Sequence, residues 1–219
     1  MLRLLLLGRN GQVGWELARA LQPIGEVIAL GRDQADLSRP ESLRDVVARH
    51  QPDVIVNAAA YTAVDRAESE PDLARAVNTE APAVLADAAR TQGALLVHYS
   101  TDYVFGGDGE RPFTEDDPTA PRNVYGLTKR DGEDAIRASG ARHLILRTSW
   151  VFGAHGGNFV RTMLRLAGER EELRVVADQI GAPTAAHTIA DVTAHCLARL
   201  ARDGSQDGTL PATGADPAL

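Results

Sequence analysis

The sequence has one cysteine, Cys196, so it cannot form an internal disulfide bond, which fits a reducing compartment. It has no long apolar run: residues 2–7 are apolar apart from Arg3, but this stretch is too short to cross a membrane. No signal-peptide cleavage site follows it. Positive charge is not in excess either, and the formal net charge of -7 disfavours nucleic acid and anionic membrane surfaces as partners. These absences predict a cytoplasmic protein.

The remaining composition is that of a folded domain. Hydrophobic residues make up 44% and charged residues 24% of the 219 positions, enough for one large domain. Short apolar runs alternate with helical periodicity along the chain, which predicts an α/β protein with a mostly parallel sheet. Strands are expected at 2–7, 26–30, 53–57, 95–99, 143–146, 173–177 and 209–213, and late helices at 158–167 and 189–200.

A glycine-rich turn follows the first expected strand and precedes a helical pattern. Glycines allow the backbone to approach a pyrophosphate, and the free N–H groups at a helix start attract its charge. This context predicts a dinucleotide site, whereas a tight turn that needs positive φ is the alternative. The residues concerned are Gly8, Asn10, Gly11, Gln12, Val13 and Gly14.

The end of the second strand separates NAD from NADP, because an acid there would bind the ribose 2′-hydroxyl and an arginine would accommodate a 2′-phosphate. The strand closes on Gly31 and Arg32, which favours NADP(H), helped by Arg9. NADH stays open as a second cofactor, since Arg32 also fits a solvated loop. Asp36 and Leu37 are expected near the adenine.

The third strand ends in small side chains. Asn57 is followed by Ala58, Ala59 and Ala60, which leave room for a flat ligand above the sheet. Tight packing of helix on sheet explains them equally well. Asn78, inside the next helical pattern, faces either solvent or the site.

Tyr125 and Lys129 are spaced to lie on one face of a helix. An ammonium beside a phenol lowers the tyrosine pKa from about 10. Thr101, at the end of the fourth strand, would hold a carbonyl oxygen against that phenol. The three together predict protonation of a ketone, and the alternative is an ordinary helix surface with a half-buried ring. Trp150 is expected either in the core or as a stacking platform.

Six motifs together resemble the extended short-chain dehydrogenase/reductases. They are Gly8-x-x-Gly11-Gln12-Val13-Gly14, the runs 57–65 and 100–105, Tyr125-x-x-x-Lys129, and the runs 147–151 and 178–184. The resemblance implies a Rossmann-like, doubly wound parallel sheet. It is strongest to the branch that acts on dTDP-linked 4-keto-6-deoxy sugars. This implies reduction of the C4 ketone of dTDP-4-dehydro-L-rhamnose to dTDP-L-rhamnose by NADPH.

The resemblance also implies roles for residues of this sequence. Tyr125 donates the proton, Lys129 lowers its pKa and binds the nicotinamide ribose, and Thr101 orients the carbonyl. Cofactor contacts are expected from Gly8, Asn10, Gly11, Gln12, Val13, Gly14, Arg32, Asp36, Leu37, Ala58, Ala59, Ala60, Tyr125 and Lys129. Substrate contacts are expected from Thr62, Val64, Thr101, Asp102, Tyr103, Trp150, Gln179 and Pro183.

Residues 1–150 are expected to form an NADP-binding domain that carries the catalytic residues. Residues 151–219 are expected to form part of a substrate-binding region, because relatives continue further. Some relatives form metal-bridged dimers, and Glu16 is a remnant of such a site at most, so no metal is assigned and Mg²⁺ stays open. A monomer or a homodimer is expected.

Two alternatives to this reductase remain. One is a non-catalytic NADP-binding subunit like the regulatory subunit of methionine adenosyltransferase. The other is a reductase or epimerase of another nucleotide sugar.

Overall fold

A parallel sheet of five strands lies at the centre of the computed structural model, which describes residues 1–108 and 111–203. The strand order is β2-β1-β3-β4-β5. The bounds are β1 Leu2–Leu7, β2 Gly25–Leu30, β3 Val54–Asn57, β4 Leu95–Thr101 and β5 His143–Thr148.

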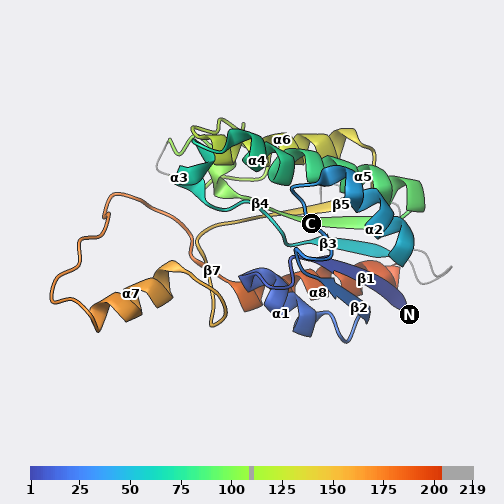
Figure 1. Ribbon diagram of the computed structural model, residues 1–219, viewed down its shortest axis with the longest axis horizontal. Coiled ribbons are helices and arrows are strands. Elements are labelled where there is room, and N and C mark those ends of the chain that lie inside the picture. Colours follow the sequence, from blue (N-terminus) through green and yellow to red (C-terminus); the bar gives the residue numbers. More distant parts are fainter. Residues whose placement is uncertain (109–110, 204–219) are drawn as a thin grey trace.

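Helices cover both faces of this sheet (Figure 1). On one face lie α2 (Leu43–His50), α5 (Ala81–Gln92) and α6 (Val124–Ala138), and on the other lie α1 (Gln12–Ala20) and α8 (Ala186–Asp203). Shorter elements are the 3-10 turns Pro40–Ser42 and Asp102–Val104, the helices α3 (Val64–Ala67) and α4 (Pro71–Arg75), and a π-helical turn at Ala76–Glu80. The predicted doubly wound α/β class is confirmed.

The leucine run of β1 fits its place in the middle of the sheet. Leu4 and Leu6 pack in the cluster that contains α1 and α8, whereas Leu5 and Leu7 pack in the cluster that contains α2 and α5. A parallel strand that is covered on both faces needs apolar side chains at every position. The continuous run therefore places the first glycine turn directly above the middle of the core.

The order of the strands creates a crevice. The chain leaves β1 toward β2 on one side and later returns to β3 on the other. Connections that diverge in this way open a gap at the carboxyl ends of the two strands, where ligands of doubly wound sheets bind.

The region after β5 differs in part from the prediction. Residues 173–177 do not form a strand, since Val175 and Val176 are exposed and no described strand pairs with them. They belong to a long loop that projects from the sheet together with α7 (Phe159–Ala167) (Figure 1). Beneath it, β6 (Val151–Phe152) pairs in parallel with β7 (Thr184–Ala185). The strand expected at 209–213 lies outside the described residues.

The last described helix, α8, belongs to the same core as the N-terminal strands. Ala190 and Leu197 pack with Leu4 and Leu6, and the Tyr99 hydroxyl lies 2.8 Å from Thr193 Oγ1. Part of the region after residue 150 thus completes the layer that supports the sheet, and a division into domains at that residue stays a prediction.

Candidate active site

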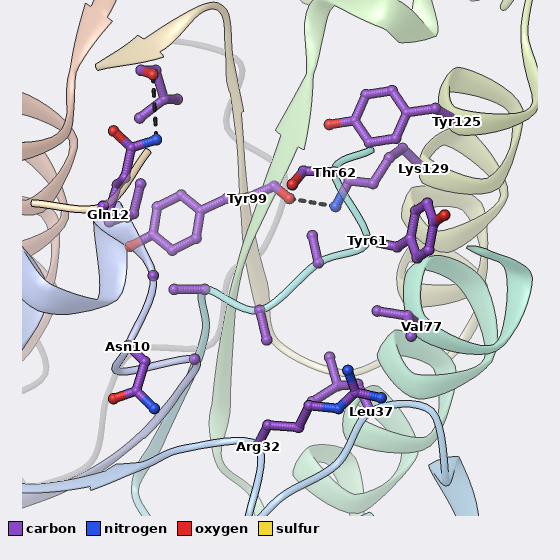
Figure 2. A pocket seen from close by; sticks show the side chains of 18 of the residues that line it. Asn10, Gln12, Arg32, Leu37, Tyr61, Thr62, Val77, Tyr99, Tyr125 and Lys129 are labelled. Carbon is purple, nitrogen blue, oxygen red and sulfur yellow. Dashed lines mark hydrogen bonds between the residues drawn. The ribbon is translucent and has the colours of Figure 1, made fainter. Parts of the chain in front are cut away.

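A cavity of about 690 Å³ opens at the crevice between β1 and β3. Its walls come from the segments after β1, β2 and β3, from the end of β4 and from α6 (Figure 2). This volume is typical of a ligand site. Fourteen predicted site residues line it: Gly8, Asn10, Gly11, Gln12, Val13, Arg32, Asp36, Leu37, Ala58, Ala59, Ala60, Thr62, Tyr125 and Lys129.

The glycine turn has the geometry of a phosphate cradle. Gly8 has φ +84°, and a Cβ there would lie 2.8 Å from the Ala59 nitrogen. A Cβ on Gly14 would collide with the Gly8 carbonyl oxygen, so Gly14 acts in packing α1 on the turn, outside the described lining of the cavity. Gly11 is the N-cap of α1 and no described side chain accepts from its first N–H groups. These donors are available to an anion.

The end of β2 presents a cation to the cavity. Arg32 is 76% exposed at its side chain and lies 3.3 Å from Asp36 Oδ1. Asp36 also accepts from the Ser38 backbone N–H and hydroxyl. Burial raises the pKa of Asp36, but the Ser38 hydrogen bonds and Arg32 outweigh it, so this pKa is lowered overall. Arg9, which was expected to help Arg32, is outside the described lining of the cavity and donates to the Ala29 carbonyl at 3.2 Å, so its help stays a prediction.

Tyr125 and Lys129 project from α6 into the cavity, as their spacing predicted (Figure 2). The helix begins where Asn123 Oδ1 accepts from the Gly126 N–H at 2.7 Å. This cap places Tyr125 in the first turn and brings Lys129 one turn later onto the same face. Both residues are buried, Lys129 to 2% exposure.

The predicted effect of Lys129 on Tyr125 is wrong for the ligand-free chain. The pKa of Tyr125 is raised to about 12, mainly by burial and further by the charge of Asp102, against an opposing hydrogen bond from Thr101. Burial lowers the pKa of Lys129 to about 8. Desolvation disfavours the charged form of both groups, which the spacing of two residues on a helix cannot show.

Thr101, at the end of β4, and the next two residues, Asp102 and Tyr103, surround the phenol of Tyr125. The Thr101 hydroxyl accepts from the Tyr103 N–H at 3.2 Å and donates to Asp102 Oδ1 at 3.1 Å. Asp102 Oδ2 accepts from the Ser149 hydroxyl at 2.6 Å, which ties β4 to the end of β5. The rings of Tyr103 and Tyr125 meet edge to face with their centroids 5.5 Å apart. Thr101 and its neighbours therefore orient the tyrosine from outside the described lining.

Comparison of the sequence with known proteins identifies the family of this chain. The chain matches the model of the RmlD substrate binding domain over residues 2–217. It is 57% identical over 202 residues to a dTDP-4-dehydrorhamnose reductase of Burkholderia thailandensis, covering 92% of this chain and 68% of that protein. It is 54% identical over 200 residues to the Escherichia coli enzyme of the same name, covering 90% and 67%. The chain belongs to the dTDP-4-dehydrorhamnose reductase family.

Structure comparison agrees. A dTDP-4-dehydrorhamnose reductase from Bacillus anthracis, solved in complex with NADP, superposes with a TM-score of 0.86. It is 39% identical, and the match covers 90% of this chain and 70% of that one. This chain thus spans about two thirds of the length of these family members.

Some of the predicted substrate residues are outside the described lining of the cavity. Val64 packs beside Tyr61, Tyr103 and Val124 in a small apolar cluster. Trp150 is 44% exposed, so it is not a core ring, and its indole lies against Gly181. Gln179 and Pro183 are exposed on the loop next to Gly181.

Several lining residues were missed by the sequence analysis. They are Gly31, Ala35, Tyr61, Arg66, Glu70, Leu73, Val77, Tyr99, Ser100, Thr148, Val151, Gly156 and Gly157. Asn78, a polar residue inside a helical pattern, was the sequence feature that could have led to Tyr61. Its amide oxygen accepts from the Tyr61 N–H at 2.9 Å and its amide nitrogen donates to the Tyr61 carbonyl at 3.1 Å. Asn78 is thus neither solvent-facing nor in the site, but holds one wall of the site in place.

Gln12 links the glycine turn to the projecting region. Its Oε1 accepts from Asn158 Nδ2 at 2.9 Å, and His155 Nε2 lies 3.2 Å from the Asn10 carbonyl oxygen. The segment between β6 and α7 therefore closes over the turn.

No helix within residues 1–108 and 111–203 is long and apolar enough to span a membrane. In the same residues, no three His, Cys, Asp or Glu side chains gather as a metal site would need, and Glu16 forms an ion pair with Arg19.

Proposed function

We propose that this protein reduces the C4 ketone of dTDP-4-dehydro-L-rhamnose to dTDP-L-rhamnose with NADPH. The observation that carries this is the joining of two sites in one cavity, which holds a phosphate cradle at the glycine turn and a buried tyrosine–lysine pair on α6. The names of the relatives in Burkholderia thailandensis and Escherichia coli support the same reaction. They do not favour a non-catalytic subunit.

NADPH fits the residues present. The free N–H groups at the start of α1 suit its pyrophosphate, and Arg32 suits its 2′-phosphate. The glycine at position 31, where an acid would bind a free ribose 2′-hydroxyl, favours NADPH over NADH. The NADP complex of the Bacillus anthracis relative supports this choice. When bound, the nicotinamide supplies the hydride that reaches C4.

Tyr125 acts as the general acid. Because its pKa of about 12 keeps the phenol protonated, the proton stays on the ring until negative charge develops on the ketone oxygen. Thr101, beside the phenol at the end of β4, is proposed to orient the ketone oxygen against it. Lys129, as an ammonium, then stabilises the phenolate that remains and holds the nicotinamide ribose.

The sugar nucleotide approaches from the open side of the cavity. Thr62 is exposed on the wall nearest to Tyr125 and Lys129 and is the first candidate contact (Figure 2). Trp150, Gln179 and Pro183 lie on the neighbouring loops and are proposed to contact the nucleotide part. This division assigns chemistry to α6 and specificity to the region around β6 and β7.

The proposal is tested by a panel of nucleotide sugars. NADPH consumption is followed with dTDP-4-dehydro-L-rhamnose and with other 4-keto sugar nucleotides. Rapid oxidation with the dTDP-rhamnose precursor alone is expected. Oxidation only with another sugar would change the substrate, and no oxidation with any, beside co-purification with a partner enzyme, would favour a regulatory subunit. Localisation in the cytoplasm is part of the same proposal, since the single cysteine fits a reducing compartment.

A further inference from the structure

Lys129 ends a row of three buried side chains from three different elements. Asn57 closes β3, His98 lies in β4, and Lys129 lies in α6. Asn57 Nδ2 is 3.2 Å from His98 Nδ1, and His98 Nε2 is 3.1 Å from Lys129 Nζ. The proposed mechanism uses Lys129 but gives no role to His98 or Asn57.

The positions of the hydrogens in this row can be deduced from the end at Asn57, where the partner is a backbone N–H group. The Ala59 backbone N–H can only donate, and it lies 3.2 Å from Asn57 Oδ1, so this atom is the amide oxygen. The other amide atom is then an NH₂ group, which also only donates. His98 Nδ1 must accept from it and cannot carry a hydrogen.

His98 therefore carries its hydrogen on Nε2. A second ring hydrogen, which would make the imidazole a cation, is excluded because burial lowers the pKa of His98 well below its usual value. The Nε2–H points at Lys129 Nζ. An ammonium has three hydrogens and no lone pair, so it cannot accept this hydrogen bond, whereas a neutral amine can.

We propose that Asn57 and His98 are positioning residues that favour the neutral amine form of Lys129 over the ammonium in the absence of cofactor. In this arrangement Lys129 Nζ accepts from His98 and donates to the Tyr99 carbonyl oxygen at 2.7 Å. Each contact along the row then pairs a donor with an acceptor. With a charged lysine, one pair of donors would face each other at 3.1 or 3.2 Å.

The surroundings of Lys129 agree with an amine. Burial lowers its pKa, and the charge of Glu133 on the same helix opposes this only in part. Glu133 is engaged by Arg147 from β5 and by Arg137 from α6. The group that faces Lys129 from β4 is His98. Tyr125, on the same helix, is a neutral phenol.

Composition singles out the same position. Lys129 is the one lysine of the sequence, and the other residues of the Lys+Arg total of 23 are arginines. An arginine cannot lose its proton in a protein. Apart from the N-terminal amine, the chain thus has an amine that can change its charge only at this site. One consequence rests on the proposed function: binding of the anionic cofactor favours the ammonium, so that above about pH 8, where Lys129 is mainly the amine, the protein takes up a proton on binding.

The single lysine makes the charge state directly measurable. Protein labelled with ¹³C and ¹⁵N in lysine alone gives one Cε signal, which is titrated without cofactor. We expect a midpoint near pH 8. A midpoint at or above the value of about 10.4 for a free lysine would overturn the proposal.

Asn57→Asp tests the row itself. A carboxylate at position 57 accepts from both the Ala59 N–H and His98 Nδ1, which moves the ring hydrogen to Nδ1 and lets Nε2 accept from an ammonium. We expect the lysine midpoint to rise by about one pH unit or more, because the amine loses one hydrogen bond and the new carboxylate also favours the ammonium. An unchanged midpoint in a folded variant would contradict the row.

Ring ¹⁵N shifts of the histidines give a test that needs no variant of the row. His143 Nδ1 and His195 Nδ1 each face a carbonyl oxygen, at 2.8 and 2.7 Å, so both serve as internal standards with hydrogen on Nδ1. We expect His98, assigned by loss of its signals in His98→Phe, to carry hydrogen on Nε2. A hydrogen on Nδ1 would refute the proposal. Neither spectrum needs substrate. Failure of this inference can therefore be told apart from failure of the proposed function, which a turnover assay tests.

Discussion

Glu133 and Arg147 form a buried ion pair that joins α6 to β5. The arginine donates from Nε at 3.0 Å and from Nη2 at 2.7 Å to the two carboxylate oxygens, and the Glu133 side chain has no exposed surface. Because Lys129 lies one turn before Glu133, this pair fixes the part of α6 that carries the catalytic residues.

Arg147→Met is therefore expected to destabilise the protein. It leaves a buried carboxylate with the exposed Arg137 as its remaining cation, which costs about 3–5 kcal/mol. Arg137→Met is the matched control and should cost less than about 1 kcal/mol. Urea unfolding at neutral pH measures both. Equal losses would mean that the Glu133–Arg147 pair has no special role.

The same pair predicts a dependence on acid. Burial raises the pKa of Glu133, but Arg147 and Arg137 outweigh it, so the pKa in the fold is lower than in the unfolded chain. A lowered pKa contributes stability above the unfolded value of about 4.3, and this is lost as the pH falls further. The difference in the free energy of unfolding between wild type and Arg147→Met should hence become smaller below about pH 4. If this difference did not change with pH, the loss would come from packing and not from the ion pair.

Gly126→Ala is expected to disturb the start of α6. A Cβ at Gly126 would collide with the Tyr103 carbonyl oxygen, so the start of the helix must move away from Tyr103. We expect a loss of about 1–3 kcal/mol in stability and roughly tenfold in kcat, because Tyr125 is displaced. Gly168→Ala, where the nearest atom is 3.6 Å away, is the control and should change neither. A fully active Gly126→Ala would show that the phenol is not held by this contact.

Arg32→Ala should weaken the binding of NADPH far more than the binding of NADH. Loss of a charge-assisted contact to a 2′-phosphate is expected to raise the Kd of NADPH about tenfold or more, with little change for NADH. Arg39→Ala removes an exposed arginine of the same connection outside the described lining of the cavity, and serves as the control. Fluorescence titration with both cofactors decides. Parallel losses for the two would remove the assignment of Arg32.

Lys129→Met should change how stability depends on pH. The pKa of Lys129 is about 8 in the fold and about 10.4 when unfolded, so the unfolded chain binds more protons between these values. The stability of the wild type therefore rises with pH in this window, by about 3 kcal/mol in total, whereas this contribution is absent from the variant. Unfolding measured from pH 7 to 10 checks the difference. A difference that does not vary with pH would contradict a lowered lysine pKa.

The parts that sequence reasoning predicted depend on short spacings. The apolar run of β1, the glycines that follow it and the pair Tyr125–Lys129 are each set by residues close together in the chain. Their period and chemistry place them on the correct element and edge, because connections in a doubly wound sheet all deliver strand ends to one side.

The parts that it missed depend on distant partners. The direction of the Tyr125 pKa follows from burial beneath Tyr103 and Asp102, and the wall at Tyr61 is set by Asn78, 17 residues later, in a π-helical turn. Residues 173–177 have the β-branched side chains of a strand, but no described strand lies beside them. Strand propensity without a neighbour does not form a sheet.

The reductase proposal is tested most directly by following the hydride itself. NADPH deuterated at the transferred position is incubated with dTDP-4-dehydro-L-rhamnose and either wild-type protein or Tyr125→Phe. We expect deuterium at C4 of dTDP-L-rhamnose with the wild type. The variant should bind NADPH with nearly unchanged affinity and form almost no product. Unlabelled or absent product with the wild type, or full turnover by Tyr125→Phe, would contradict proton donation by Tyr125 to a ketone reduced at this site.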